Sequence, residues 1–237
     1  MPNHVSNILK MKGIAKLPLF GERENKYCEG GIERYFDFNK MIPMPESLEV
    51  ESGSTEDIAI EAVLRKLSKH RFLGKNYCSM DDDDYKKRVE NHGKSEDELA
   101  ELGLQYISNK IKYGATNWHD WCCNNWGTKW NAYELEIIDD DTIMFQTAWS
   151  SPEPVIEKLA EMYPDAHIEH WWADEDMGRN CGYREYGNGC WYGDYDDADS
   201  QEAYEHYIKC WGETNCLYQD EDGNWQRHTC EDCHGCY

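Results

Sequence analysis

The sequence lacks long apolar runs, and basic residues are scarce in its second half. No stretch of about 18 apolar residues occurs, so we expect no membrane span. The N-terminus, Met-Pro-Asn-His-Val, has no basic segment followed by an apolar one, so we expect no secretory signal and a cytoplasmic location. In that compartment the 11 cysteines are expected to be thiols or metal ligands rather than disulfides.

Several signatures of catalysis and cofactor binding are also missing. The chain has no Walker or GxGxxG phosphate loop, and no carboxylate pair suggests a hydrolase. Runs of aspartate at 81–84, 139–141 and 194–199 lack the glycine placement of an EF-hand loop. Such runs are typical of solvated loops, so the sequence favours a non-enzymatic protein.

Negative charge is abundant, and it is concentrated in one part of the chain. Residues 1–133 carry 19 Lys/Arg and 21 Asp/Glu, a net of −2, whereas residues 134–237 carry 5 and 26, a net of −21. Such a field repels nucleic acids and membranes and attracts basic partners. The acidity indicates either simple solubility or a surface that docks on a basic protein.

The hydrophobic periodicity predicts an α+β fold. Alternating residues predict strands at 3–12 and 166–173, a short strand from 35 and a hairpin of 133–138 with 142–149. Helical spacing predicts helices at 56–71, 96–113 and 152–163, and Ser95 with Glu98 forms a capping box. The predicted architecture is a ferredoxin-like antiparallel sheet with helices on one face, over 1–178, with a polar exposed insertion at 74–95.

Residues 179–237 differ in composition and are expected to form an acidic, Cys-rich C-terminal appendage. We expect a hairpin at 181–193 through Asn188-Gly189, a helix at 200–211 and a hairpin at 217–225. The chain ends with Cys230, Cys233, His234 and Cys236, whose first pair has zinc-like spacing. Cys210 and Cys216 could supply a second pair of ligands, so the appendage is a candidate zinc site. Free thiols, or disulfides formed on lysis, are the alternatives.

The densest feature is the tryptophan-rich segment 117–132, Asn-Trp-His-Asp-Trp-Cys-Cys-Asn-Asn-Trp-Gly-Thr-Lys-Trp-Asn-Ala. A core plug that closes one end of the sheet is the favoured interpretation, because tryptophan is costly to leave in water. A binding surface or ligand pocket is the alternative. Its candidate binding residues are Trp118, Trp121, Asn125, Trp126, Lys129, Trp130 and Asn131.

The same segment contains a Cys–His combination. His119 and Cys122, three residues apart on a helix, could touch and form an activated nucleophile. No oxyanion-hole motif accompanies them, and the local negative field favours a thiol over a thiolate. We therefore predict buried structural thiols and no catalytic residue here.

Four segments together resemble one known family. They are Met-Pro-Asn-His-Val-Ser-Asn at the start, Phe-Asp-Phe-Asn-Lys-Met-Ile-Pro-Met-Pro-Glu at 36–46, Asn-Asn-Trp-Gly-Thr-Lys-Trp-Asn-Ala at 124–132 and Phe-Gln-Thr-Ala-Trp-Ser-Ser-Pro-Glu-Pro-Val-Ile at 145–156. In this order they resemble the YubB-type ferredoxin-like domain of phage and conjugative-plasmid proteins. The resemblance covers about 1–178 and implies a ferredoxin-like fold and a mobile-element origin. It implies no catalytic residues, and His4 and Val5 depart from the family's usual Trp-Cys.

These observations give three hypotheses for function. The first is a non-enzymatic accessory protein that binds a host protein with a basic surface, such as a nucleic-acid-binding defence protein. It would be an anti-restriction or anti-CRISPR DNA mimic that itself contacts neither nucleic acid nor membrane. Its acidic contacts would include Asp194, Asp196, Asp197 and Asp199. The second is a small-molecule or nucleotide binder or enzyme using a Trp/Asn/Lys pocket at 117–132, and the third is a structural or virion-associated protein.

Overall fold

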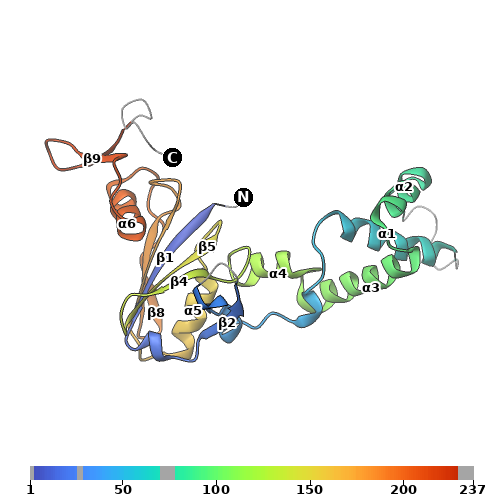
Figure 1. Ribbon diagram of the computed structural model, residues 1–237, viewed down its shortest axis with the longest axis horizontal. Coiled ribbons are helices and arrows are strands. Elements are labelled where there is room, and N and C mark those ends of the chain that lie inside the picture. The colour runs from blue at the N-terminus through green and yellow to red at the C-terminus, as the bar shows by residue number, and fades with distance from the viewer. Residues whose placement is uncertain (1–2, 26–28, 70–77, 229–237) are drawn as a thin grey trace. The chain divides into compact units, whose positions relative to one another are not determined.

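The computed structural model describes residues 3–25, 29–69 and 78–228. The chain divides into two compact units, which we treat separately (Figure 1). The sheet unit comprises Met1–Pro43 and Asn125–Tyr237, and the helical unit comprises Met44–Asn124. The expected boundary between 178 and 179 does not coincide with this division, because residues on both sides of it lie in the sheet unit.

The sheet unit is built on a six-stranded antiparallel sheet in the order β4-β5-β1-β6-β7-β8. Its strands are β1 (His4–Met11), β4 (Tyr133–Ile137), β5 (Thr142–Ala148), β6 (Ile168–Asp174), β7 (Gly182–Gly187) and β8 (Cys190–Tyr192). The order β4-β5-β1-β6, with a helix between β5 and β6, is the ferredoxin-like arrangement, so the predicted fold class is confirmed. β7 and β8 extend this sheet, so part of the expected appendage 179–237 is sheet.

The two faces of the sheet carry different helices (Figure 1). Residues opposite one another in the antiparallel register share a face, so Leu9, Ile143 and His170 point the same way. Helix α5 (Glu153–Met162) has its buried Val155, Ile156 and Leu159 on its inward side. Helix α6 (Gln201–Trp211) packs with Ile8 and Trp171, which lie on the other face. The expected appendage therefore supplies the second helical layer.

Aromatic packing completes the core of the sheet unit. A hairpin of β2 (Phe20–Glu24) and β3 (Ile32–Phe36) leads into Phe38. The rings of Phe36 and Phe38 lie 5.1 and 6.2 Å from that of Phe145. A second small hairpin, β9 (Leu217–Gln219) with β10 (Trp225–Arg227), follows α6, as expected for 217–225.

Gly182 shows why a side chain is excluded at one point of the sheet. A Cβ there would lie 2.3 Å from the Trp172 ring and 2.7 Å from the carbonyl oxygen of Asp194. The absent side chain allows Tyr195 to bridge Gly182 and extend the pairing beyond β8. This close approach brings Asp194 beside β7.

The helical unit contains α1 (Ser54–Lys69), α2 (Asp82–His92), α3 (Glu96–Tyr113) and most of α4 (Trp118–Asn125). The capping box predicted at Ser95 and Glu98 is confirmed. Within the exposed insertion expected at 74–95, residues 82–92 form helix α2, which Asp81 caps; most of its residues are exposed, but Tyr85, 2% exposed, packs among core residues. Residues 74–77 of that expected insertion lie outside the described residues.

The buried face of α1 is formed by small residues together with Ile58 and Val63. Ile60 and Leu64 are half-buried and Leu67 is exposed, whereas Ala59 and Ala62 are buried. The reason lies in α3, where a Cβ on Gly103 would stand 2.1 Å from the carbonyl oxygen of Ala59. The helices meet along small residues, so apolar size alone did not indicate the contact line.

Candidate functional site

The tryptophan-rich segment is divided between the two units. Trp118 and Trp121 lie on α4 in the helical unit, and Trp121 is buried. Asn125 ends α4 and, with Trp126, Lys129, Trp130 and Asn131, is assigned to the sheet unit. The list of candidate binding residues is therefore not one continuous surface element of a single unit.

Trp126 and Asn131 make internal contacts that tie a loop to the sheet unit. Trp126 is 3% exposed, and its Nε1–H donates to the carbonyl of Ile42 at 2.9 Å. Asn131 accepts from the backbone N–H of Phe38 at 3.0 Å and donates to Asp37 at 2.9 Å. These contacts are those of a structural anchor, as the plug interpretation expects.

Lys129 lies between two indoles. Its Nζ is 4.7 Å from the ring centroids of both Trp130 and Trp149. Trp149 adopts a φ of 75°, which is unusual for a bulky residue, and is 43% exposed. The ammonium already occupies the aromatic cage, so Lys129 acts there as an internal cation.

In the Cys–His combination on α4, burial disfavours the thiolate of Cys122. Burial raises the pKa of Cys122 to about 12, so its sulfur stays a thiol, which lies 3.9 Å from the Met44 sulfur. His119 lies against its neighbour Asp120, with Nδ1 3.2 Å from the carboxylate. A thiolate nucleophile is not provided by this geometry.

Three of the four predicted acidic contacts are engaged within the chain. Asp196 lies 2.7 Å from Nδ1 of His206, and Asp199 pairs with Arg179 at 2.7 Å. Asp194 lies 3.5 Å from the guanidinium of Arg184. Asp197 is exposed in the turn before α6. These residues hold the 194–200 segment in place in addition to contributing charge.

The predicted zinc ligands Cys230, Cys233, His234 and Cys236 lie outside the described residues. Within the described ranges, no cluster of three or more His, Cys, Asp or Glu side chains could hold a metal. Of the expected second pair, Cys210 is buried with a raised pKa, and Cys216 takes part in a disulfide bond. The disulfide at Cys216 departs from the expectation that the cysteines are thiols or metal ligands, and burial favours the thiol form of Cys210.

All basic side chains of residues 134–228 are engaged by the chain itself. The five pairs are Lys158 with Glu161, Arg179 with Asp199, Arg184 with Glu153, Lys209 with the ring of Trp171, and Arg227 with Asp176. Exposed carboxylates remain, among them Glu175, Asp197, Glu205, Glu213 and Glu221. The outward electrostatic field of residues 134–228 is therefore negative. We call the exposed surface of these residues the acidic surface.

Arg184 lies at the centre of a cluster between α5 and β7. Its side chain is 6% exposed and pairs with Glu153 at 3.0 Å, with Glu157 at 3.7 Å and with Asp194 at 3.5 Å. The guanidinium carbon lies 4.3 Å from the ring centroid of Trp191, which is 52% exposed. One guanidinium thus faces three carboxylates and an indole. A lone arginine in an alternating strand and glutamates four apart on a helix are the sequence signals that could have revealed this cluster.

Buried polar groups continue from Arg184 along the same face of the sheet. His170 is fully buried, and its Nε2 lies 3.0 Å from Oδ1 of Asn7, while Asn7 donates its own amide to Val5 and Thr147. His170 therefore donates from Nε2. Burial, aided by the Arg184 charge, lowers the pKa of His170 to about 3, so the ring stays neutral. Nδ1 of His170 has no hydrogen-bond partner among the described residues.

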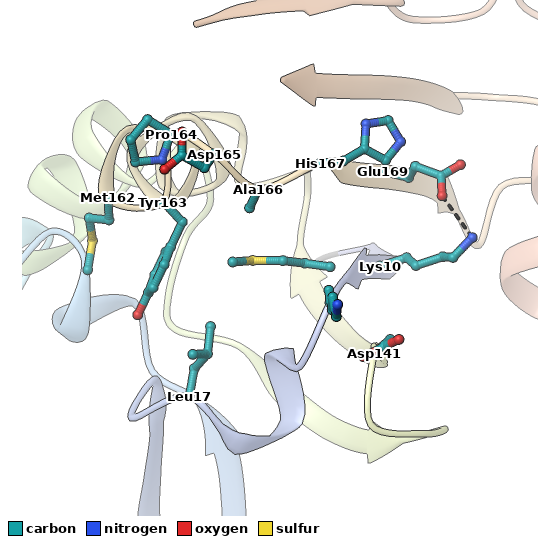
Figure 2. Close-up of a pocket in the computed structure, with 12 residues that line it drawn as sticks. Lys10, Leu17, Asp141, Met162, Tyr163, Pro164, Asp165, Ala166, His167 and Glu169 are labelled. Atoms are coloured by element: carbon teal, nitrogen blue, oxygen red, sulfur yellow. Dashed lines mark ion pairs between the residues drawn. The ribbon is translucent and has the colours of Figure 1, made fainter. Parts of the chain in front are cut away.

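An open cavity of about 820 Å³ lies where β1 ends and β6 begins. Figure 2 shows Tyr163, Met162 and Leu17 along its wall and the Lys10–Glu169 ion pair, 2.9 Å long, at one side. The ion pair raises the pKa of Lys10, so its ammonium persists. The cavity has the size of a small-molecule site but no convergent set of buried polar groups.

The sheet order and crossover helix define a ferredoxin-like domain. Residues 125–218 match the family model for the ferredoxin-like domain in Api92-like protein. The matched range includes β7, β8 and α6, so it continues past residue 178, where the sequence analysis ended the domain. No described helix is long and apolar enough to cross a membrane.

Among solved structures, the chain is similar to the protein api92 from Yersinia pseudotuberculosis. The similarity covers 83% of this chain and 100% of that one, with 11% sequence identity and a TM-score of 0.33. A likeness of this size carries no functional argument. The curated proteins contain no match to the chain.

Proposed function

We propose that this chain is a non-enzymatic accessory protein that binds a protein partner with a basic surface. The carrying observation is that all five Lys and Arg side chains of 134–228 are engaged internally, while many carboxylates face solvent. A partner that approaches residues 134–228 therefore meets a net negative field from this part of the chain. Such a field accelerates encounter with a positive surface and is screened by salt.

The class of partner follows from the same charge. A protein that normally binds DNA or RNA presents a basic surface, which a carboxylate-covered protein can occupy as a nucleic-acid mimic. The resemblance to the YubB-type family suggests a mobile-element origin, for which a host defence nuclease or CRISPR effector is a fitting partner. This role would be carried out in the host cytoplasm without direct nucleic-acid or membrane contact.

Charge reversal with a matched control tests the proposal. Partners are captured from host lysate with the tagged full chain, identified, and re-measured as purified proteins at low and high salt. We expect at least tenfold weaker binding by Glu205→Lys/Glu213→Lys/Glu221→Lys, since these glutamates are exposed on the acidic surface. The control Glu49→Lys/Glu90→Lys/Glu101→Lys changes the net charge equally but within the helical unit, and it should bind nearly as well as wild type.

Two outcomes would contradict this function. One is a purified partner whose affinity does not change with salt. The other is equal weakening by the two triple variants, which would show that net charge alone matters. Asp196 and Asp199 are left unchanged because their reversal would break the pairs with His206 and Arg179.

The cavity of Figure 2 favours a second candidate, a small-molecule binder. Its volume of about 820 Å³ lies within the range of ligand sites. A thermal-shift screen of nucleotides tests it, because a ligand that binds only the folded state raises the melting temperature. A shift lost in Tyr163→Ala but kept in Lys129→Ala would assign the ligand to this cavity rather than to the tryptophan-rich segment.

A further inference from the structure

A second, smaller cleft lies between α5 and the β7–β8 hairpin. Its volume is about 320 Å³. Glu157 and Glu161 lie along its helix side, Tyr186 and Trp191 along its strand side, and Ala160 and Pro164 add apolar contact. Aromatic walls beside carboxylates make a site that differs in chemistry from the open cavity of Figure 2.

We propose that this cleft binds the cationic end of a basic side chain, arginine or lysine, presented by a protein partner. The inference rests on the proposed function and names the place where that partner is anchored. It assigns a specific recognition site within a surface that otherwise attracts basic proteins without regard to sequence.

The net charge around the cleft favours a cation. Arg184 contributes one positive charge, against the carboxylates of Glu153, Glu157 and Asp194. Glu161 follows Glu157 by one helical turn, and its side chain is 68% exposed. Lys158 pairs with Glu161 at 2.8 Å and adds a second positive charge, so the four carboxylates still outnumber the two cations.

The chain already shows how this site holds a guanidinium. Arg184 lies against the Trp191 indole at 4.3 Å while its nitrogens contact carboxylates. An indole face and a carboxylate together favour a cation more than either group alone. A partner's arginine or lysine would use the part of the Trp191 ring that remains exposed beside Arg184, with the exposed carboxylates of Glu157 and Glu161 as its acceptors.

Tyr186 forms part of the wall of the cleft. It is 3% exposed, and its hydroxyl is shielded from solvent. Burial raises the pKa of Tyr186 to about 12, against the opposing effect of the neighbouring Arg184 guanidinium, so the group stays a neutral hydroxyl. A cation that enters the cleft would therefore be received by the exposed carboxylates of Glu157 and Glu161, with Tyr186 as an aromatic wall.

A blocked tripeptide with a central arginine is a direct probe. Its matched control has glutamine in the centre, which keeps length and polarity but removes the charge. Binding to the full chain is followed by NMR at low salt, through the Trp191 indole N–H assigned with Trp191→Phe. We expect a saturable shift with the arginine peptide and at least tenfold weaker binding of the glutamine peptide.

Variants of the cleft decide the assignment. Glu157→Gln/Glu161→Gln should weaken the arginine peptide at least tenfold, whereas Glu205→Gln/Glu213→Gln, which removes the same charge elsewhere on the acidic surface, should leave binding within about twofold. Unchanged binding in the first variant, equal loss in both, or no shift with the arginine peptide would overturn the proposal. A free polyamine that binds more tightly than the peptide would overturn the part concerning a protein partner.

The outcome is separable from that of the proposed function. If the arginine peptide binds but no salt-sensitive protein partner is found, the cleft is a cation site and the proposed function is contradicted. If a salt-sensitive partner binds the Glu157→Gln/Glu161→Gln variant as tightly as wild type, the proposed function is supported, but the cleft is not part of the interface.

Discussion

At the scale of single residues, the buried polar groups beneath α5 decide how the sheet unit responds to pH. His170 is fully buried with a pKa of about 3, whereas an unfolded histidine has a pKa of about 6.5. As the pH falls below about 6.5, the unfolded chain binds a proton that the folded chain does not. His170 therefore makes folding less favourable with decreasing pH, down to its folded pKa.

The expected result is a loss of about 1.4 kcal/mol in the free energy of unfolding per pH unit below about 6.5 from this group. Denaturant unfolding of wild type and His170→Gln at pH 7 and 5 measures it, and the variant should lack this part of the pH dependence. His119→Gln, at a partly exposed histidine, is the control and should follow wild type. If the free energy of unfolding fell equally with pH in wild type and in His170→Gln, the His170 ring would bind a proton in the folded state as readily as in the unfolded chain.

At the scale of elements, close helix packing depends on one glycine. Gly103 allows α3 to approach α1 so closely that a Cβ would lie 2.1 Å from a backbone oxygen of Ala59 and 2.8 Å from the Val63 side chain. A backbone atom cannot rotate away, so the helices would have to separate. The same substitution at an exposed helical site would increase helix propensity.

We therefore expect Gly103→Ala to destabilise the helical unit by about 1–3 kcal/mol, as overpacking does. Thermal unfolding followed by circular dichroism measures this change. Glu101→Ala, an exposed position on the same helix, is the control and should stay within about 0.5 kcal/mol of wild type. A stabilised Gly103→Ala protein would mean that α1 and α3 are farther apart.

At the scale of the whole molecule, like charges outnumber opposite ones. The net charge is −23, and residues 134–237 carry most of it. Self-repulsion of this kind opposes the compact state and is screened as ionic strength rises. Stability and binding therefore respond to salt in opposite directions.

We expect the melting temperature to rise between about 10 mM and about 200 mM NaCl, a range in which the screening length falls from about 30 to below 10 Å. The rise should be smaller in Glu205→Lys/Glu213→Lys/Glu221→Lys, which has less repulsion to screen. Differential scanning calorimetry gives both values. A melting temperature that falls with added salt would show that attractive ion pairs outweigh the repulsion.

The sequence by itself determined the antiparallel ferredoxin-like core and many of its elements, although β2 and α2 were not predicted. Alternation marked β1, β5 and β6, the Ser95–Glu98 capping box marked the start of α3, and Asn188-Gly189 marked the turn of β7–β8. These signals are local, since each depends on residues a few positions apart. They could therefore be interpreted without knowing which segments meet.

Only the tertiary structure decided which residues share a site. Glu153 and Arg184 lie 31 positions apart in the chain, and Asn7 and His170 lie 163 apart, yet each pair is in hydrogen-bond contact. It also placed α6 on the second face of the sheet and paired Asp196 and Asp199 internally, although the sequence presented them as free surface charge. The physical reason is that pairing and burial depend on long-range register, and the local pattern of residues does not specify it.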